Sequence, residues 1–84
     1  MTVKEKQELR TRLLKELYDY NEETGGEEKE IFIGTPMDEA GKQLILAYEY
    51  LDGKGLISFK PLYEFAYSAK INSYGIDFVE EMLD

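Results

Sequence analysis

Three adjacent pairs of carboxylates are the residues whose types and spacing could most readily do chemistry: Glu22 with Glu23, Glu27 with Glu28, and Glu80 with Glu81. Such pairs act as general acids and bases when a pocket shifts their pKa values. These pairs are expected in a charged loop or on exposed helix faces, where water solvates them. The sequence contains no His and no Cys, so the commonest general base and the thiolate nucleophile are missing. We therefore predict a non-enzymatic protein with no catalytic residue, no metal site and no cofactor.

Two glycine motifs could be mistaken for phosphate-binding loops. Gly53, Lys54 and Gly55 follow a predicted helix instead of linking a strand to a helix, and residues 34–36 have the composition of a helix cap. Neither motif is followed by the Lys-Ser or Lys-Thr that a P-loop requires. Both motifs are better interpreted as helix caps.

The net charge of −8 is unevenly distributed along the 84 residues. Residues 1–15 carry a balance of +3, residues 16–41 of −8, residues 42–75 of +1 and residues 76–84 of −4. An acidic balance opposes binding to duplex DNA, which draws much of its affinity from phosphate neutralisation by Lys and Arg. Contacts with DNA would therefore have to come from the two segments with an excess of cations.

Length and composition are typical of one small globular domain, residues 1–84, since a chain this short builds a single modest core. The absence of Cys favours a cytoplasmic location over a secreted scaffold. No apolar run approaches the roughly 20 residues that span a bilayer, and the charged N-terminus does not have the pattern of a signal sequence. We expect no membrane association.

Hydrophobic spacing predicts three helices and a hairpin. Apolar residues at 9, 13, 14 and 17 predict a helix over about residues 4–22. The β-branched run 31–33 predicts a short strand, and residues 56–60 and 63–71 predict a hairpin in which Pro61 marks a bend or an edge. A last helix, with Asn72 or Ser73 as its N-cap, reaches residue 83 and has a buried side made of Ile76, Phe78, Val79 and Met82.

The middle helix has the clearest start signal. Thr35 as N-cap, Pro36 at the first helical position and Asp38 at the third predict a capping box. The apolar rhythm then continues to residue 52, and Gly53 or Gly55 supplies a left-handed C-cap. Two alternatives remain open for residues 35–52: one continuous helix, or a helix-turn-helix with Gly41 as its elbow.

The residues expected to form the core come from all of these elements. They are Leu13, Leu17, Leu44, Tyr48, Leu51, Leu56, Ile71 and Phe78.

Two short phrases carry a family resemblance. The middle helix leads into Leu51, Asp52, Gly53, Lys54, Gly55, Leu56 and Ile57, and the hairpin leads into residues 71–79, Ile-Asn-Ser-Tyr-Gly-Ile-Asp-Phe-Val. With the order of elements, these phrases resemble the winged-helix superfamily, particularly small uncharacterised winged-helix proteins of Gram-positive bacteria and their phages, the YjcQ type. The resemblance implies an α+β winged-helix fold, with three main helices and a two- to three-stranded antiparallel β-hairpin wing. It also implies a DNA-binding transcriptional regulator.

The resemblance assigns candidate contacts with duplex DNA to two elements. The groove-facing helix contributes Lys42, Gln43 and Tyr50, and the wing contributes Lys60, Tyr63 and Lys70. Tyr50 and Tyr63 are the tyrosines expected to be exposed. Because these cations are few, a monomer should bind weakly, and a homodimer or the basic N-terminal helix would have to contribute.

Two further hypotheses do not involve DNA binding. One is a protein–protein interaction module that turns its acidic face toward a basic partner. The other is a carboxylate-rich DNA mimic from a phage or mobile element. The position of Lys42, Lys60 and Lys70 discriminates among them, because DNA binding through these residues requires that they share a face.

Overall fold

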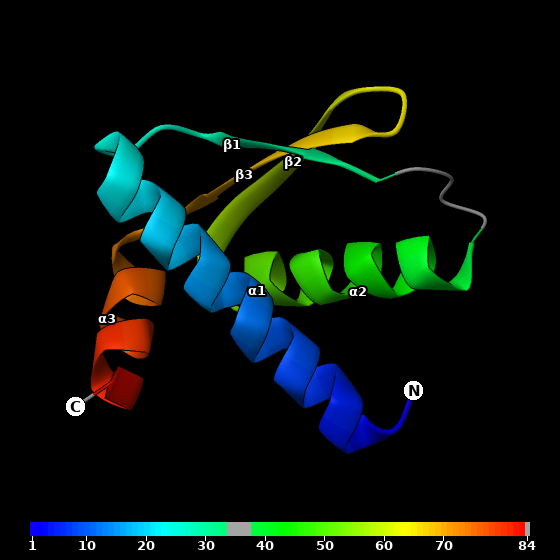
Figure 1. The fold of residues 1–84 in the computed structure, drawn as a ribbon, viewed down its shortest axis with the longest axis horizontal. Helices are drawn as coiled ribbons and strands as arrows, with labels where there is room; N and C mark the ends of the chain where they lie inside the picture. Colours follow the sequence, from blue (N-terminus) through cyan, green and yellow to red (C-terminus); the bar gives the residue numbers. More distant parts are fainter. Residues whose placement is uncertain (34–37, 84) are drawn as a thin grey trace.

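Helices and strands follow one another in the order α1 (Val3–Thr24), β1 (Lys29–Phe32), α2 (Glu39–Gly53), β2 (Ile57–Tyr63), β3 (Ala66–Ile71) and α3 (Ser73–Leu83) (Figure 1). The computed structural model describes residues 1–33 and 38–83. Within these ranges, three helices and a three-stranded antiparallel sheet give an α+β, winged-helix-like arrangement, which confirms the predicted fold class. In the same ranges, no helix is long and apolar enough to cross a membrane.

The sheet has the strand order β1-β3-β2, with both neighbouring pairs antiparallel. The predicted hairpin is confirmed by the pairing of Ile57 with Ile71, and β1 joins as the predicted third strand through Ile31 opposite Tyr67. Pro61 lies in β2, at an edge of the sheet, where a residue without a backbone N–H is tolerated. The pairing shifts between Pro61 and Tyr63, so the strand is irregular near its end.

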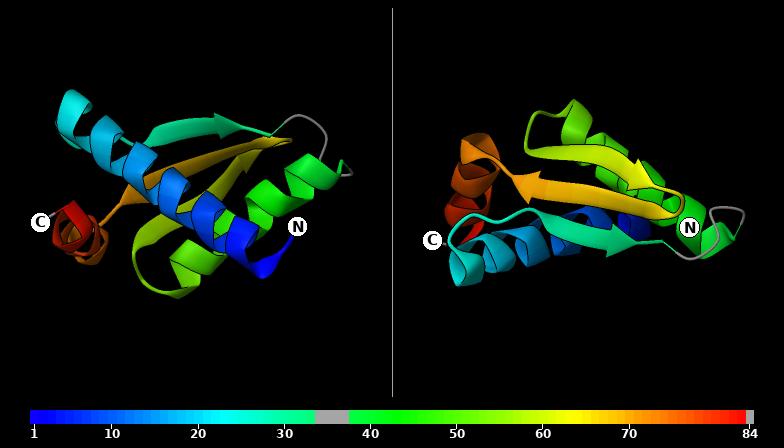
Figure 2. Two further views of the ribbon diagram at one scale, coloured as in Figure 1. Left: turned by 60° about the horizontal axis from the view of Figure 1, so that its bottom comes forward. Right: turned by 90° about the horizontal axis from the view of Figure 1, so that it is seen from above.

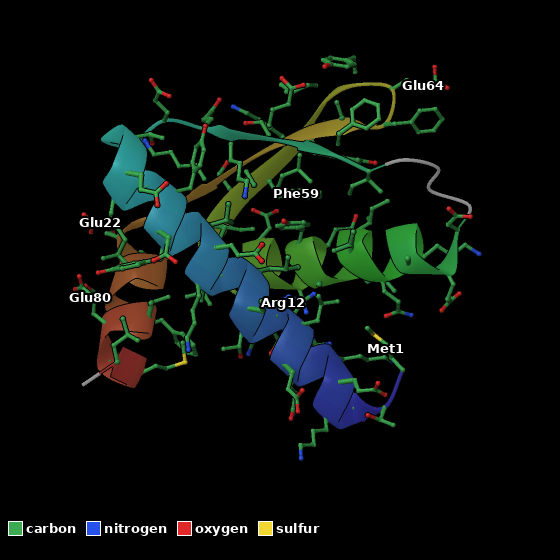
Figure 3. The ribbon with its side chains drawn as sticks, viewed as in Figure 1. Met1, Arg12, Glu22, Phe59, Glu64 and Glu80 are labelled. Atoms are coloured by element: carbon green, nitrogen blue, oxygen red, sulfur yellow. The ribbon has the colours of Figure 1, made fainter. Side chains whose placement is uncertain are left out.

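All three helices of the described chain lie on one side of the sheet, as the view onto the strands shows (Figure 2). Phe59 points to that side and lies between the sheet and α2 (Figure 3). Its ring stacks on Tyr48 at a centroid distance of 5.0 Å and on Tyr67 at 4.9 Å. Because side chains alternate along a strand, Lys60 and Ser68 point to the opposite, uncovered face of the sheet.

The core lies between the helices and the sheet. Of the predicted members, Leu13, Leu17, Tyr48, Leu51 and Ile71 are buried. Two others, Leu44 and Leu56, are only partly buried and pack against the cluster.

The burial of Phe78 was predicted wrongly, since 46% of this residue is exposed. Met82, also expected on the buried side of α3, is 41% exposed. The helix instead turns Gly75 and Val79 inward. A Cβ at position 75 would collide with the Leu56 carbonyl oxygen and lie 2.6 Å from Ile71 Cγ1, so glycine permits the close approach.

The start of α2 differs from the prediction. The helix begins at Glu39, and Asp38 is its N-cap, with extended backbone angles (φ −68°, ψ 146°) and no side-chain capping hydrogen bond. Asp38 is therefore not the third helical residue of a capping box, and Thr35 and Pro36 lie outside the described residues. Gly41 is buried in the first turn of one continuous helix, so the interpretation of Gly41 as an elbow is wrong.

Two caps set the direction of the chain after α2. The Leu56 N–H donates to the Leu51 carbonyl and the Gly55 N–H to the Asp52 carbonyl, with Gly55 left-handed at φ 75°. This is a Schellman motif, and it selects Gly55 over Gly53 as the left-handed residue. At the start of α3, Asn72 Oδ1 accepts from the Gly75 N–H at 3.0 Å, so Asn72 is the N-cap.

Candidate functional site

The wing cations lie beside acidic side chains on the uncovered face of the sheet. Lys60 Nζ lies 3.3 Å from Glu28 Oε1, and this ion pair stands on the uncovered face of the sheet. The hydrogen bond from Lys60 is the main cause of a lowered pKa at Glu28, and the charge of Lys70 acts in the same direction. Both predicted wing lysines are thus partly neutralised by the loop that precedes β1.

Tyr63 also contacts the acidic strand. Its hydroxyl donates to Glu30 Oε1 at 2.6 Å, and this bond to a carboxylate raises the pKa of the tyrosine. Glu30 lies opposite Ser68 and Tyr63 lies opposite Ala66, so the two side chains meet diagonally across the central strand. Tyr63 is 59% exposed, as predicted, but its polar end is already engaged.

The candidate residues of α2 divide between two faces of that helix. Gln43 and Tyr50 are about two turns apart and both line a hollow against α1, where the Gln43 side chain donates to Glu39 at 3.0 Å. Tyr50 is 41% exposed, as expected. Lys42 is exposed and lies about 100° further round the helix.

The lysines predicted to bind DNA therefore do not share a face. Lys60 and Lys70 lie on the uncovered face of the sheet, whereas α2 and its Lys42 lie behind the other face (Figure 2). A duplex on the wing would meet Glu28 and Glu30 beside the lysines.

A different set of residues lines a groove across α1, α2 and α3, which we call the three-helix groove. It consists of three adjoining hollows of ≈ 270, ≈ 440 and ≈ 420 Å³. The first two share Arg10 and Tyr50, and the last two share Lys54, Leu56 and Phe78. The residues that line it are Lys6, Gln7, Leu9, Arg10, Thr11, Leu14, Gln43, Leu46, Ala47, Tyr50, Leu51, Lys54, Gly55, Leu56, Tyr74, Asp77, Phe78 and Glu81.

Cations flank an aromatic ring at the centre of this groove. The Arg10 guanidinium carbon lies 3.9 Å from the centroid of the Tyr50 ring, and Lys54 Nζ lies 5.7 Å from it. In the described residues neither cation is within ion-pair distance of a carboxylate. Cation–π contact orients these charges beside apolar surface and leaves them available to an anion.

The apolar part of the groove continues onto α3. Tyr74, Phe78 and Met82 are spaced four residues apart, and they are 73%, 46% and 41% exposed. Sequence reasoning missed this exposed stripe because it assigned Phe78 and Met82 to the same buried side as Val79. The sequence does contain a signal for the exposed stripe. Gly75 and Val79 form a second stripe, and a helix of this size packs only one of the two stripes against the core.

Neither a metal centre nor an acid–base pair emerges from the carboxylates. The described residues contain no group of three or more His, Cys, Asp or Glu that could hold a metal ion. Glu80 accepts a hydrogen bond of 2.9 Å from the Tyr18 hydroxyl, and this bond is the main cause of a raised tyrosine pKa. That contact ties α3 to α1 near the acidic end of α1, where Glu22 and Glu80 are seen together (Figure 3).

Comparison of the chain with protein-family models, with curated proteins and with solved structures gave no match. Membership of the winged-helix superfamily therefore stays a prediction, carried by the two sequence phrases and by the order of helices and strands.

Proposed function

We propose that this chain is a non-enzymatic winged-helix domain that binds protein, and that the three-helix groove receives an acidic amphipathic helix. The observation that carries the proposal is the pair of cations, Arg10 and Lys54, beside the Tyr50 ring in a groove with apolar walls. An amphipathic helix would place its apolar side chains against Tyr50, Leu56 and Phe78. Carboxylates beside those side chains would reach the two cations.

This proposal differs from the original hypothesis of a basic partner at the acidic face. The acids of that face are partly engaged within the chain, because Glu28 pairs with Lys60 and Glu30 accepts from Tyr63. Exposed acids without apolar surface contribute little affinity in water. The groove, in contrast, offers apolar area and charge together.

Duplex DNA is less well supported as a ligand. Affinity for DNA grows with the number of phosphates that Lys and Arg neutralise. Here the wing lysines lie among carboxylates, and Lys42 is separated from them by the sheet. The net charge of −8 adds repulsion from the whole molecule.

Two titrations of the same fluorescently labelled protein, kept at submicromolar concentration, test the proposal. One uses a helical peptide with an aromatic stripe flanked by Glu, and the other a mixed-sequence DNA duplex at low salt. We expect saturable peptide binding that Lys54→Glu weakens and that Lys42→Glu, a charge reversal outside the groove, leaves unchanged. The duplex should not bind.

Two results would overturn the proposal. One is binding of the duplex with a steep salt dependence and no binding of the peptide. The other is peptide binding that Lys54→Glu and Lys42→Glu weaken equally, because that would assign the effect to overall charge instead of the groove.

A further inference from the structure

The exposed face of α3 is itself an acidic amphipathic surface. Its apolar stripe consists of Tyr74, Phe78 and Met82, and Asp77 and Glu81 follow the first two members by three residues. Residues three and four apart are neighbours on a helix, so the two carboxylates border the stripe. The helix has the composition that the three-helix groove is proposed to receive.

Charge is distributed asymmetrically along the same groove. The hollow between α1 and α2 is lined by Lys6 and Arg10 and by no acid. The hollow at the other end is lined by Asp77 and Glu81 together with Lys54. The middle hollow joins apolar residues, among them Leu56 and Phe78, to the cations Arg10 and Lys54.

A surface that is cationic at one end and acidic at the other fits a second copy of itself after a two-fold rotation. In such an isologous contact each patch meets the same patch of the other copy in the opposite direction. Rotation about an axis near the middle hollow brings the Asp77 and Glu81 end of each copy toward the Lys6 and Arg10 end of the other. The apolar stripes meet at the centre.

We propose that the occupant of the three-helix groove is α3 of a second copy of this chain, so that the protein forms a two-fold homodimer. This inference rests on the proposed function of the groove and names its partner. The rotation sets Arg10 against Glu81 twice, once in each direction.

The available area fits a small dimer interface. Aromatic side chains bury about 150–250 Å² each. With about 200 Å² for each side chain and the exposed fractions of Tyr50, Tyr74, Phe78 and Met82, the exposed area amounts to roughly 400 Å² per copy. That value is within the ~300–600 Å² range for the largest patch on a monomer and below the ~800 Å² per partner of a standard interface. The dimer should therefore be reversible.

Sedimentation velocity on the full chain, from micromolar to millimolar concentration, tests the proposal. The parent chain should convert from monomer to dimer as concentration rises. Tyr74→Ser should move this transition to higher concentration without loss of fold, because the side chain is mostly in water. Arg10→Glu and Glu81→Lys should each weaken the dimer by roughly tenfold or more, since a two-fold axis applies each reversal twice.

Mixing the two charge-reversal variants gives the decisive comparison. Each variant alone sets like charges against each other at both contacts, whereas a heterodimer of Arg10→Glu with Glu81→Lys has opposite charges at both. The mixture should therefore dimerise at concentrations where either variant is monomeric. An equal mixture of the control variants Lys42→Glu and Glu49→Lys, on the outer face of α2, should behave as its components do.

Three outcomes would overturn the dimer: a parent chain that is monomeric at millimolar concentration, no recovery in the variant mixture, or equal recovery in the control mixture. Circular dichroism of each variant identifies a loss of fold. If a charge-reversal variant is unfolded, the shift of the monomer–dimer transition in Tyr74→Ser still tests the interface. If the chain stays monomeric while the acidic peptide still binds, the groove function stands and only its occupant is wrong. If neither occurs, the groove function itself fails.

Discussion

Gly75→Ala should destabilise the protein although alanine is the better helix former. Ala stabilises a helix interior by about 1 kcal/mol relative to Gly. At position 75, however, the added Cβ would collide with the Leu56 carbonyl oxygen and lie 2.6 Å from Ile71 Cγ1. That carbonyl also accepts the Asn72 N–H at 3.1 Å, so the backbone cannot move away without loss of a hydrogen bond at the start of α3. Overpacking of this kind costs ~1–3 kcal/mol, and the lost hydrogen bond adds about 1 kcal/mol.

The expected net loss is about 2 kcal/mol, a large share of the total stability of a domain this small. Each kcal/mol corresponds to a fall in Tm of roughly 4–8 °C for a chain of this length. Urea melts and thermal melts followed by circular dichroism measure both quantities. The matched control is Gly53→Ala, also in a helix, where an added Cβ meets nothing within 4 Å. Gly53→Ala should be neutral or slightly stabilising, and equal stabilisation by both substitutions would refute the packing argument.

Further expectations concern the core, a buried phenol and the wing. Leu51→Ala should cost ~2–5 kcal/mol in urea melts, because Leu51 is buried. Phe78→Ala should cost only about 1 kcal/mol, because nearly half of that residue is already in water, and equal losses would contradict the observed placement of α3. Burial raises the pKa of Tyr48 to about 12, from an ordinary value of 10.0. The folded state thus holds the phenol proton more tightly than the unfolded state. This stabilisation is complete below pH 10.0 and is lost as the pH rises through about 12. A spectrophotometric tyrosine titration in which Tyr48→Phe removes no late-ionising group would contradict the raised pKa. Lys60→Met should raise the pKa of Glu28, followed by NMR of the carboxyl carbon, and an unchanged pKa would show that the ion pair does not persist in solution.

Local signals in the sequence determined most of the elements. The spacing of Leu9, Leu13 and Leu17 predicted α1, and Pro61 marked an edge strand correctly. The sequence offered Gly53 or Gly55 as the left-handed residue after α2, and Asn72 or Ser73 as the N-cap of α3. The structure uses Gly55 and Asn72. These signals are reliable because caps and amphipathic spacing depend on neighbours within one or two turns of the chain.

Tertiary packing decided what those elements expose. The apolar pattern of α3 is compatible with burial of either Val79 or Phe78, and only the close approach of Gly75 to Leu56 selects Val79. The sequence likewise did not reveal the ion pair between Glu28, in the loop before β1, and Lys60. The β1-β3-β2 strand order brings these two residues together. The three-helix groove has the same origin, since Arg10, Tyr50 and Phe78 come from helices far apart in the sequence. Composition and periodicity describe one element at a time, whereas a binding surface depends on how several elements pack together.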